Sequence, residues 1–368
     1  MSFSVNPKIT ESESLTVFVK NWAVGKGDLI ISNKFVLEPH IEGEKAPCDV
    51  LYQEEFGIGE PSDEMIDAML ESIEGESYDR IIAIGGGSVI DIAKLFVFGS
   101  GLTCGEIFEK NSTLARKRKL IIIPTTCGTG SEVTGISIVE FKKKKTKVGL
   151  VSPLLFAEEA VLIPAMLSTL PYEIFAATSI DALIHAVESY ISPKSNLFVR
   201  ANGRSAIELI LNGYKAIAAT GKRERPSDMK DFLYASTLAG IAFENAGCAA
   251  VHALSYPIGG LFHVAHGKAN YIVFKGVFSK YRELGADLSA LENILQDILN
   301  CNAENVWEAL FTLIDKILVR PVLRDFGVDD TKCAEMAASV IANQQRLLAN
   351  NPIPLSERDV YEIFKTCV

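Results

Sequence analysis

The sequence predicts an α/β N-terminal domain with a mostly parallel sheet at residues 1–165 and an all-helical C-terminal domain at residues 166–368. Short β-branched runs alternate with amphipathic segments in the first part, and this alternation favours parallel strands with helices packed on the sheet. Long helical periodicities rich in Ala, Leu and Ile fill the second part. A chain of 368 residues, 48% of them hydrophobic, can also build a core in each of two domains.

The expected strands of the N-terminal domain lie at residues 28–32, 49–53, 80–84 and 119–123. Helical patterns at residues 62–72 and 88–98 separate some of them. Two strand-like segments between residues 136 and 151 enclose a run of lysines, which predicts a hairpin that projects from the sheet.

The helices expected in the C-terminal domain lie at residues 173–191, 231–245 and 331–349. The β-branched runs end at residues 162–164, where we expect the two domains to meet. The sequence contains no internal repeat.

The charge balance excludes one large class of partner. Lys and Arg total 36 and Asp and Glu total 46, so the formal net charge is −10 and nucleic acid is not expected as a partner. The N-terminus has no basic region followed by a long apolar run, and no uninterrupted apolar stretch approaches the roughly 18 residues that span a bilayer. We therefore expect a cytoplasmic protein with no membrane partner.

Cysteine and histidine are distributed differently. Seven cysteines form an odd set without a CxxC pair, which argues against a disulfide framework and against a thiolate zinc site. Of only five histidines, three fall within fifteen residues: His252, His263 and His266. Composition alone does not explain this cluster.

Three glycines, Gly85, Gly86 and Gly87, separate an expected buried strand from an expected helix. Glycines let backbone amides approach an anion closely, and a helix N-terminus adds unpaired N–H groups, so a pyrophosphate could bind here. Ser88 and Asp91 have the spacing of a capping box, which would fix the start of the helix. The alternative is a tight turn without a ligand.

A second loop rich in glycine and hydroxyl groups follows the next expected strand. Its hydroxyl-bearing residues are Thr125, Thr126, Thr129 and Ser131. Two such loops at the carboxyl ends of parallel strands define a ligand crevice, so we expect a nucleotide-binding domain. A solvated turn is the alternative for this loop taken alone.

Asp181 and His185 lie four residues apart, on one face of an expected helix. Alone, they could be a hydrogen-bonded pair. His252 and His266 flank a segment that breaks at Pro257, so the chain can fold back between them. One aspartate and three neutral imidazoles would form a site suited to iron(II) or zinc, with a further position open for a substrate oxygen.

At these residues the chain resembles the iron-containing alcohol dehydrogenase family, which shares its fold with dehydroquinate synthase. The resemblance extends from about Val24 to the C-terminus. It implies a dehydroquinate synthase-like fold, NAD(H), Fe²⁺ with Zn²⁺ as the alternative, a small-molecule substrate and a homodimer. The implied metal ligands are Asp181, His185, His252 and His266. The implied cofactor-binding residues are Asn33, Gly86, Gly87, Ser88, Asp91, Thr125, Thr126, Thr129, Ser131 and Lys147.

Within the family, the segment 252–271 is most similar to the 4-hydroxybutyrate dehydrogenases. Residues 57–65 and 344–351 are similar to the same group. The resemblance implies that the enzyme interconverts 4-hydroxybutyrate and succinate semialdehyde. A simple primary alcohol, a diol or lactaldehyde is the alternative substrate on the same fold. A binding protein without turnover and a lyase that keeps its NAD bound are the remaining interpretations.

Two positions near the predicted metal depart from the family pattern. Many members carry a histidine, usually placed near the nicotinamide and the substrate, where this chain has Tyr256, one turn after His252. His263 is an additional histidine. We therefore expect Tyr256, His263 or a chain of water and the cofactor ribose to carry the proton. The alternative is that Tyr256 packs in the core and His263 lies at the surface.

A third departure is Asn33, which follows the first expected strand. NAD-preferring relatives often place there an aspartate that accepts hydrogen bonds from the adenosine ribose. Asparagine can still bond those hydroxyls but would not repel a 2′-phosphate. The resemblance therefore implies NAD, with NADP left open.

A substrate carboxylate in an apolar pocket needs a cationic or hydrogen-bonding partner. Arg346 and Lys268 are the candidates, although Lys268 could equally face solvent. Lys147 aligns with a family lysine near the cofactor, whereas the neighbouring lysines are expected in a solvated hairpin tip.

Overall fold

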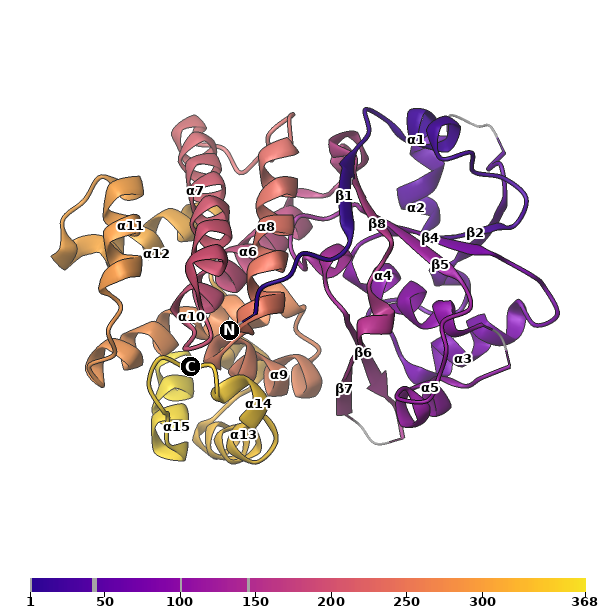
Figure 1. Ribbon diagram of the computed structural model, residues 1–368. Coiled ribbons are helices and arrows are strands. Elements are labelled where there is room, and N and C mark those ends of the chain that lie inside the picture. The colour runs from indigo at the N-terminus through magenta and orange to yellow at the C-terminus, as the bar shows by residue number, and fades with distance from the viewer. Residues whose placement is uncertain (1, 42–44, 100, 144–145) are drawn as a thin grey trace. The chain divides into compact units, whose positions relative to one another are not determined.

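The computed structural model describes residues 2–41, 45–99, 101–143 and 146–368. These residues form two compact units (Figure 1). The α/β unit consists of Val5–Leu170 and Asp228–Leu233, and the helical unit consists of the chain up to Ser4, Pro171–Ser227 and Tyr234–Val368. The sequence predicted two continuous segments that meet at residue 165. The observed units differ from that division at two short segments. The residues up to Ser4 belong to the helical unit, and Asp228–Leu233 belong to the α/β unit.

The sheet of the α/β unit has six strands. In spatial order they are β1 (Lys8–Glu11), β8 (Glu159–Leu162), β5 (Lys119–Pro124), β4 (Arg80–Gly85), β2 (Asp28–Ser32) and β3 (Asp49–Tyr52). Every neighbouring pair is parallel. The carboxyl ends of all six strands therefore lie at one edge of the sheet.

The two central strands, β4 and β5, are apolar and buried after their first residues, Arg80 and Lys119. In β4, Ile81, Ile82, Ala83 and Ile84 are each 0% exposed. Strands buried on both faces read as continuous hydrophobic runs, because helices cover both sides of a parallel sheet. The helices α3 (Asp63–Ser72), α4 (Gly87–Leu95) and α5 (Cys104–Lys110) share one core cluster with alternate residues of the strands and therefore cover one face of the sheet. The predicted α/β class with a parallel sheet is confirmed.

The four predicted strands correspond to β2, β3, β4 and β5, with ends that differ by at most one residue. The sequence missed β1 and β8, the neighbouring pair on the far side of β5. Both are only four residues long. β1 (sequence KITE) has no buried residue and thus no hydrophobic pattern, and the apolar run of β8 is too short to identify a strand by itself. Pairing with neighbouring strands defines them, and that pairing is not visible in the sequence.

The predicted hairpin is present as β6 (Ile136–Phe141) and β7 (Thr146–Val151), which form a separate antiparallel sheet. Residues 144–145 of the lysine run lie outside the described residues. The hairpin is tied to α4, because the Ser137 hydroxyl donates to the Asp91 carbonyl at 2.8 Å.

The helical unit contains long helices, as predicted. They are α6 (Tyr172–Ile191), α7 (Leu197–Thr220), most of α8 (Lys230–Ala246), α9 (Ala250–Phe262), α10 (His266–Glu283), α11 (Ser289–Leu299), α12 (Val306–Ile317), α13 (Asp330–Asn343), α14 (Gln345–Leu348) and α15 (Glu357–Thr366). α6 is long and apolar enough to cross a membrane, but 83% of its apolar window is buried inside the protein. It is the core helix of this unit.

One predicted helix, at residues 331–349, is interrupted. α13 ends at Asn343, and Gln344 separates it from the short helix α14 with a φ of −113° and a ψ of 26°. These angles do not continue an α-helix. Arg346 therefore belongs to α14 and not to a single long helix.

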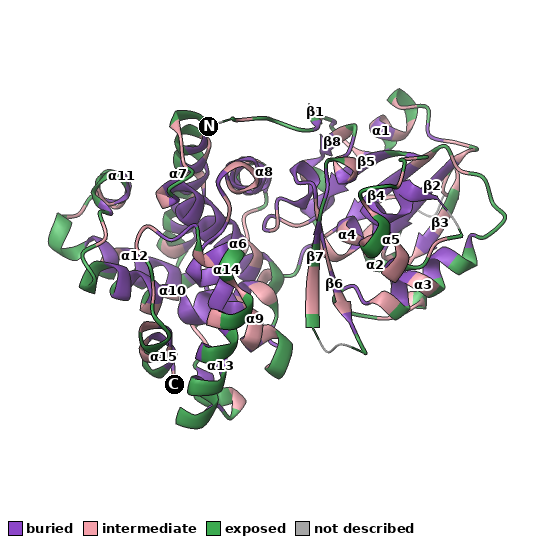
Figure 2. Ribbon diagram, turned by 60° about the horizontal axis from the view of Figure 1, so that its bottom comes forward, coloured by how far each residue is buried: buried purple, intermediate pink, exposed green. Residues whose placement is uncertain are grey.

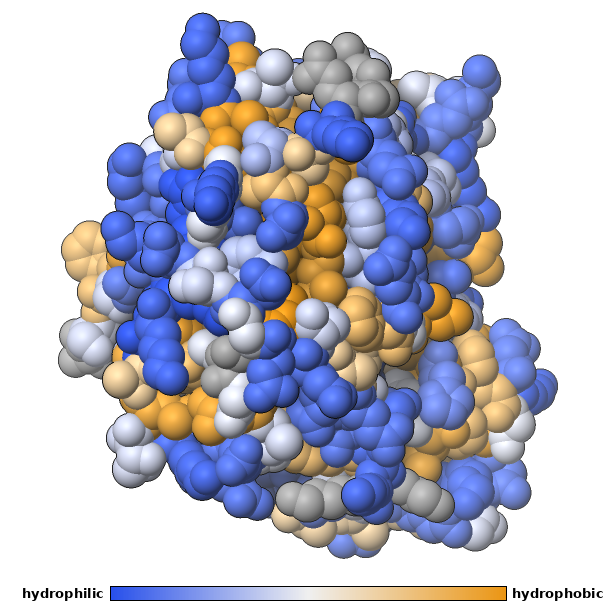
Figure 3. Space-filling view, turned by 90° about the vertical axis from the view of Figure 1, so that its right-hand side faces the viewer, coloured by the Kyte–Doolittle hydropathy of each residue, from blue (hydrophilic) through white to orange (hydrophobic). Residues whose placement is uncertain are grey.

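Burial follows the layers of each unit. Figure 2 shows the central strands β4 and β5 and the helix α6 largely as buried, whereas the outer surfaces of α11 and α13 are exposed. The face of the α/β unit in Figure 3 is mostly hydrophilic, with hydrophobic patches between charged side chains. Isolated exposed apolar residues, such as Ile58 at 88% exposure, are ordinary on a globular surface.

We predict that Ile82→Ala lowers the free energy of unfolding of the α/β unit by about 2–5 kcal/mol, because it opens a cavity in a central strand. The matched control is Ile58→Ala, which removes the same atoms from an exposed side chain and should change stability by no more than about 0.5 kcal/mol. Urea unfolding followed by circular dichroism measures both. Equal effects of the two substitutions would contradict the placement of Ile82.

Candidate functional site

The four predicted metal ligands come together in the helical unit. Asp181 and His185 lie one turn apart on α6, His252 lies in the first turn of α9, and His266 is the first residue of α10. One ligand atom from each of the four lies within 4.8 Å of the others. α10 packs against both α6 and α9, so three helices hold the group together.

The chain turns back between His252 and His266, but not where the sequence predicted. Pro257 lies inside α9, which continues to Phe262. The helix ends at His263, whose φ of 54° lies in the left-handed region. Its backbone N–H donates to the Gly259 carbonyl at 3.1 Å, as expected of a residue that ends a helix in this conformation.

Asp181 is buried and is held by a neutral amide as well as by imidazoles. The Asn270 side-chain Nδ2 donates to Asp181 Oδ1 at 2.6 Å. Burial acts to raise the pKa of the Asp181 carboxyl, but the imidazoles of His185, His266 and His252 outweigh it and place the pKa below its usual value. The carboxylate is therefore ionised and available to a cation.

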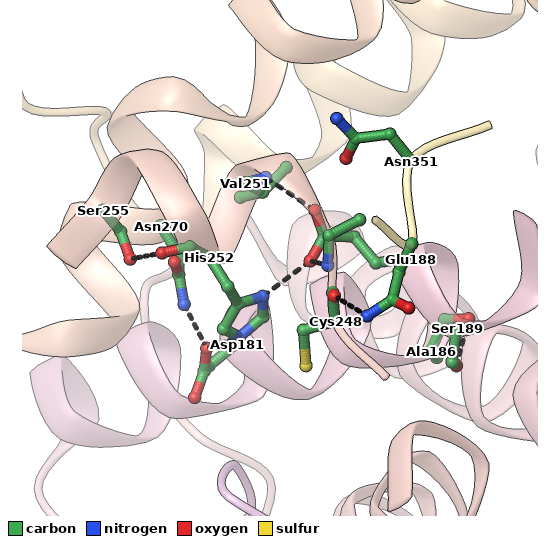
Figure 4. A network of polar contacts seen from close by, with 12 residues as sticks. Asp181, Ala186, Glu188, Ser189, Cys248, Val251, His252, Ser255, Asn270 and Asn351 are labelled. Carbon is green, nitrogen blue, oxygen red and sulfur yellow. Dashed lines mark hydrogen bonds and ion pairs between the residues drawn. The ribbon is translucent and has the colours of Figure 1, made fainter. Parts of the chain in front are cut away.

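His252 is fixed by a second carboxylate, Glu188, which lies on α6 with 0% exposure (Figure 4). The Nδ1 atom of His252 lies 2.7 Å from Glu188 Oε2. Because a carboxylate only accepts hydrogen bonds, Nδ1 carries a proton in this contact, and Nε2 is the ring nitrogen directed toward Asp181. Glu188 also accepts from the backbone N–H groups of Ala249 at 2.9 Å and Val251 at 2.6 Å, at the start of α9.

These residues fit a divalent metal ion. His252 Nε2 is buried and has no hydrogen-bond partner among the described residues. It lies 3.6 Å from Asp181 Oδ1, and His266 Nε2 lies 3.7 Å from the same oxygen, so the donor atoms converge without bonding to one another. One carboxylate and three imidazoles suit a borderline ion such as iron(II) or zinc.

The two predicted proton carriers lie in different surroundings. Tyr256 is half-buried on α9, and its ring centroid lies 6.3 Å from that of His266. His263 is exposed, and its imidazole makes no hydrogen bond or ring contact with any other described residue. The structure therefore places Tyr256, and not His263, beside a predicted ligand.

The two predicted carboxylate partners also differ. Lys268 lies on α10, and its Nζ is 3.6 Å from Glu173 Oε2 on α6. Arg346 is exposed on α14, and its guanidinium has no hydrogen bond or ion pair with the rest of the described chain. α14 packs against α9, which carries Tyr256 and His252. The positive charge of Arg346 acts on Tyr256 and lowers its pKa, against the larger effect of burial, which raises it.

The two predicted cofactor loops lie at the carboxyl ends of β4 and β5 in the α/β unit. Gly86 is the N-cap of α4 and makes no side-chain cap, so the predicted capping box of Ser88 and Asp91 is wrong. The helix begins at Gly87, where a Cβ would lie 2.7 Å from the Thr129 methyl group. Only glycine lets the two loops approach this closely, and the first amides of α4 lack side-chain acceptors, which fits a pyrophosphate.

Asp91 on α4 connects this helix to the second glycine-rich loop. Its carboxylate accepts from the Ser131 hydroxyl at 2.6 Å and from the Ile138 backbone N–H at 3.0 Å. Lys94 is 0% exposed, and its Nζ donates to Ser131 Oγ at 2.7 Å and to the Ile136 carbonyl at 2.6 Å. Burial is the main reason that the pKa of Asp91 is raised, although Lys94 opposes it. Asp91 and Ser131 are thus engaged in joining α4 to the second loop.

The other predicted cofactor residues lie around these loops. Ser88, Thr126 and Thr129 are half-buried, whereas Thr125 is 4% exposed and its N–H donates to the Gly85 carbonyl. Lys147, on β7, forms an ion pair with Glu60. Asn33 follows β2, and its Nδ2 donates to Glu54 Oε2 at 2.8 Å.

Two family models match the chain. The model for iron-containing alcohol dehydrogenase matches residues 13–164, and the model for the C-terminal part of the Fe-containing alcohol dehydrogenase family matches residues 175–368. The chain belongs to the iron-containing alcohol dehydrogenase family. It is accordingly an oxidoreductase that acts on CH–OH groups, as the resemblance implied.

Curated members of this family align over most of the chain. The 4-hydroxybutyrate dehydrogenase of Clostridium kluyveri is 44% identical over 361 residues, which cover 98% of this chain and 97% of that protein. The 1,3-propanediol dehydrogenase of Citrobacter freundii is 31% identical over 318 residues, covering 83% of this chain and 80% of that protein.

Solved structures share the fold over the whole chain. A 1,3-propanediol oxidoreductase superposes with a TM-score of 0.82 at 25% identity, covering 100% of this chain and 99% of that chain. A sulfoacetaldehyde reductase from Bifidobacterium kashiwanohense, solved in complex with NAD+, superposes with a TM-score of 0.85 at 20% identity, covering 100% and 98%. The predicted fold family is confirmed.

Sequence reasoning about this family member missed Glu188 and Asn270. Glu188 lies three residues after His185 on the expected helix. A second carboxylate on an apolar helix indicates a buried polar contact, and this signal could have identified Glu188. Asn270 lies one turn after His266. The partners of both residues come from other helices, so their roles could not be assigned from spacing.

We predict that Glu188→Gln weakens metal binding by about 10- to 100-fold, because an amide cannot accept all the hydrogen bonds that orient His252. Competition with a chelator measures the Kd for Zn²⁺ or Fe²⁺. Glu173→Gln is the matched control, since Glu173 lies on the same helix with a side chain that is 67% exposed. An unchanged Kd for Glu188→Gln would show that His252 does not need this carboxylate.

Proposed function

We propose that the protein is an NAD-dependent 4-hydroxybutyrate dehydrogenase, which interconverts 4-hydroxybutyrate and succinate semialdehyde by metal-assisted hydride transfer. The observation that carries this proposal is the 44% identity, over nearly the full length, to the Clostridium kluyveri 4-hydroxybutyrate dehydrogenase. Family resemblance and composition also support a homodimer in the cytoplasm.

The two units take different parts in this proposal. The α/β unit binds NAD(H), with the pyrophosphate at Gly86, Gly87 and Ser88. Thr126 and Thr129 flank these glycines, and Asp91 and Lys94 keep the second loop against α4. In the helical unit, Asp181, His185, His252 and His266 hold Fe²⁺, or Zn²⁺ as the alternative.

When bound, the ion supplies a positive charge that polarises the substrate oxygen, and NAD(H) exchanges the hydride. The protein supplies the fixed geometry. Glu188 accepts from Nδ1 of His252 and so leaves Nε2 as the ring nitrogen that would bind the ion. Asn270 holds the Asp181 carboxylate. Preorganised groups of this kind cost no reorganisation when charge develops on the substrate oxygen.

A proton must reach the substrate oxygen when the aldehyde is reduced. Tyr256 is the group we propose for this step, because it lies beside His266 and burial raises the pKa of its hydroxyl. The hydroxyl is therefore protonated at neutral pH and can donate. His263, exposed and without side-chain contacts among the described residues, is the weaker candidate.

Arg346 is the residue we propose for the substrate carboxylate. It is a cation without an acidic partner in the described chain, on a helix that packs against α9. Lys268 is less suited, because Glu173 already lies within ion-pair distance of it. Arginine binds a carboxylate through two parallel hydrogen bonds, which also orients the substrate.

The proposed substrate predicts a large preference between two aldehydes of equal chain length. The initial rate of NADH oxidation by anaerobically purified, Fe²⁺-loaded protein should be much higher with succinate semialdehyde than with butyraldehyde, which lacks the carboxylate. We expect kcat/KM to differ by about 10- to 100-fold, the effect of one charge-assisted contact with the substrate carboxylate. Equal values would indicate a general aldehyde reductase and remove the 4-hydroxybutyrate assignment.

Arg346→Ala should lower kcat/KM for succinate semialdehyde by about 10- to 100-fold and leave butyraldehyde reduction unchanged, because only the first substrate carries the charge that Arg346 binds. Lys268→Ala is the comparison variant and should change neither value by more than about twofold. Steady-state kinetics with both aldehydes separates the two candidates. The opposite outcome, in which Lys268→Ala alone lowers the semialdehyde rate, would transfer the role to Lys268.

A further inference from the structure

A carboxylate that the sequence did not single out lies at the cofactor edge of the sheet. Ser32, the last residue of β2, pairs with Tyr52 of β3 on one side and with Ile84 of β4 on the other. The residues that follow these strands therefore share one edge: Asn33 after β2, Glu54 after β3, and Gly86 after β4. Neighbouring strands are only about 4.8 Å apart, so all three loops are within reach of one dinucleotide.

Glu54 is held in place by the residue predicted to contact the ribose. Its Oε2 accepts from Asn33 Nδ2 at 2.8 Å, and its Oε1 accepts from the Lys34 backbone N–H at 2.6 Å. Asn33 is the N-cap of the short helix α2 (Lys34–Leu37) and makes no side-chain cap, while Glu54 accepts from the first amide of this helix, that of Lys34. The backbone carbonyl of Asn33 accepts from the N–H groups of Val36 and Leu37, whereas its side-chain Oδ1 has no partner among the described residues and can accept a hydrogen bond.

The charge around Asn33 is negative in spite of Lys34. The Lys34 ammonium lies 2.8 Å from Glu55 Oε1, so its charge is already paired. Glu38, Glu54 and Glu55 all act on the neighbouring Tyr52. After burial, which contributes most, these carboxylates raise the pKa of the Tyr52 hydroxyl, and Lys34 opposes them. Three carboxylates and one ammonium leave an excess of negative charge at this end of the edge.

We infer that Glu54 selects a dinucleotide with a free adenosine 2′-hydroxyl and excludes one with a 2′-phosphate. Ribose hydroxyls are hydrogen-bond donors, and an acidic residue at the end of a neighbouring strand is the group that accepts from them in dinucleotide-binding sheets. The Glu54 carboxylate and the side-chain Oδ1 of Asn33 offer two such acceptors on neighbouring residues. A 2′-phosphate has no proton to donate at neutral pH and would face the Glu54 carboxylate directly.

Glu54 thus supplies the charge that Asn33 lacks. Asparagine after β2 does not repel a 2′-phosphate, so that residue alone leaves the cofactor choice open. In this chain, the carboxylate comes from the end of β3 instead of the end of β2. This inference rests on the proposed binding of a nicotinamide dinucleotide along this edge of the sheet.

The test is the equilibrium binding of NADH and NADPH to the full-length protein, followed by the fluorescence of the nicotinamide. This measurement needs no metal and no turnover. The wild type should bind NADH much more tightly than NADPH. In Glu54→Gln, the ratio of the Kd for NADPH to the Kd for NADH should fall by about tenfold or more, because the amide keeps an acceptor but loses the charge.

Two further variants separate charge from structure. Glu54→Asp keeps the charge and should retain the preference for NADH, even if the shorter side chain weakens the contact with Lys34. Glu74→Gln removes one exposed carboxylate from the turn after α3, remote from Asn33 in the fold, and should leave the ratio unchanged. Thermal unfolding of each variant shows whether the loss of the Glu54 contacts affects folding.

The outcomes are distinct. A wild type that binds neither dinucleotide would contradict the proposed function itself. A wild type that binds NADH, with the same ratio in Glu54→Gln as in the wild type, would overturn the role of Glu54 and leave the proposed function intact. A loss of the preference in Glu54→Asp as well as in Glu54→Gln would also overturn it, because the contact geometry and not the charge would then control the choice.

Discussion

The helical unit depends on the burial of three polar side chains, Asp181, His185 and Glu188, along one side of the apolar helix α6. A buried carboxylate without partners costs several kcal/mol, so each of these groups must find partners on another element. Glu188 binds the first amides of α9 together with His252, and Asp181 binds Asn270 of α10. The positions of α9 and α10 against α6 are therefore fixed by the same contacts that shape the metal site.

This arrangement links folding to chemistry. Glu188 accepts hydrogen bonds from the N-terminal amides of α9, where its negative charge interacts favourably with the helix dipole. It also orients the imidazole of His252. The rings of His185 and His252 stack with centroids 4.5 Å apart, and Phe243 stacks on the other face of His185 at 4.4 Å. The ligands are held by packing and by hydrogen bonds before any ion binds, which is the condition for a rigid Lewis-acid site.

The α/β unit also buries charged side chains, and it pairs them with each other. Lys94 is fully buried, and Asp91 lies 3.7 Å from its ammonium. Both side chains are used to attach the second loop and the β6–β7 hairpin to α4. At this point the sequence-based hypothesis and the structure differ: Asp91 was expected to form a capping box with Ser88, whereas its carboxylate accepts from Ser131 and Ile138. The glycines remain at the helix start because Thr126 and Thr129 lie too close for any Cβ.

The sequence by itself determined the fold class, the central strands and the identity of the chemistry. Continuous Ile-rich runs, a glycine-rich turn and one aspartate with three histidines are local signals, and local periodicity and residue type are enough to recognise them. Only the tertiary structure decided what the polar side chains bind. The short strands β1 and β8, the turn at His263, and the partners of Glu188, Asp91 and Glu54 all depend on contacts between residues far apart in sequence. Such contacts form where helices and strands pack against one another, and the spacing of residues along the chain does not show which elements pack together.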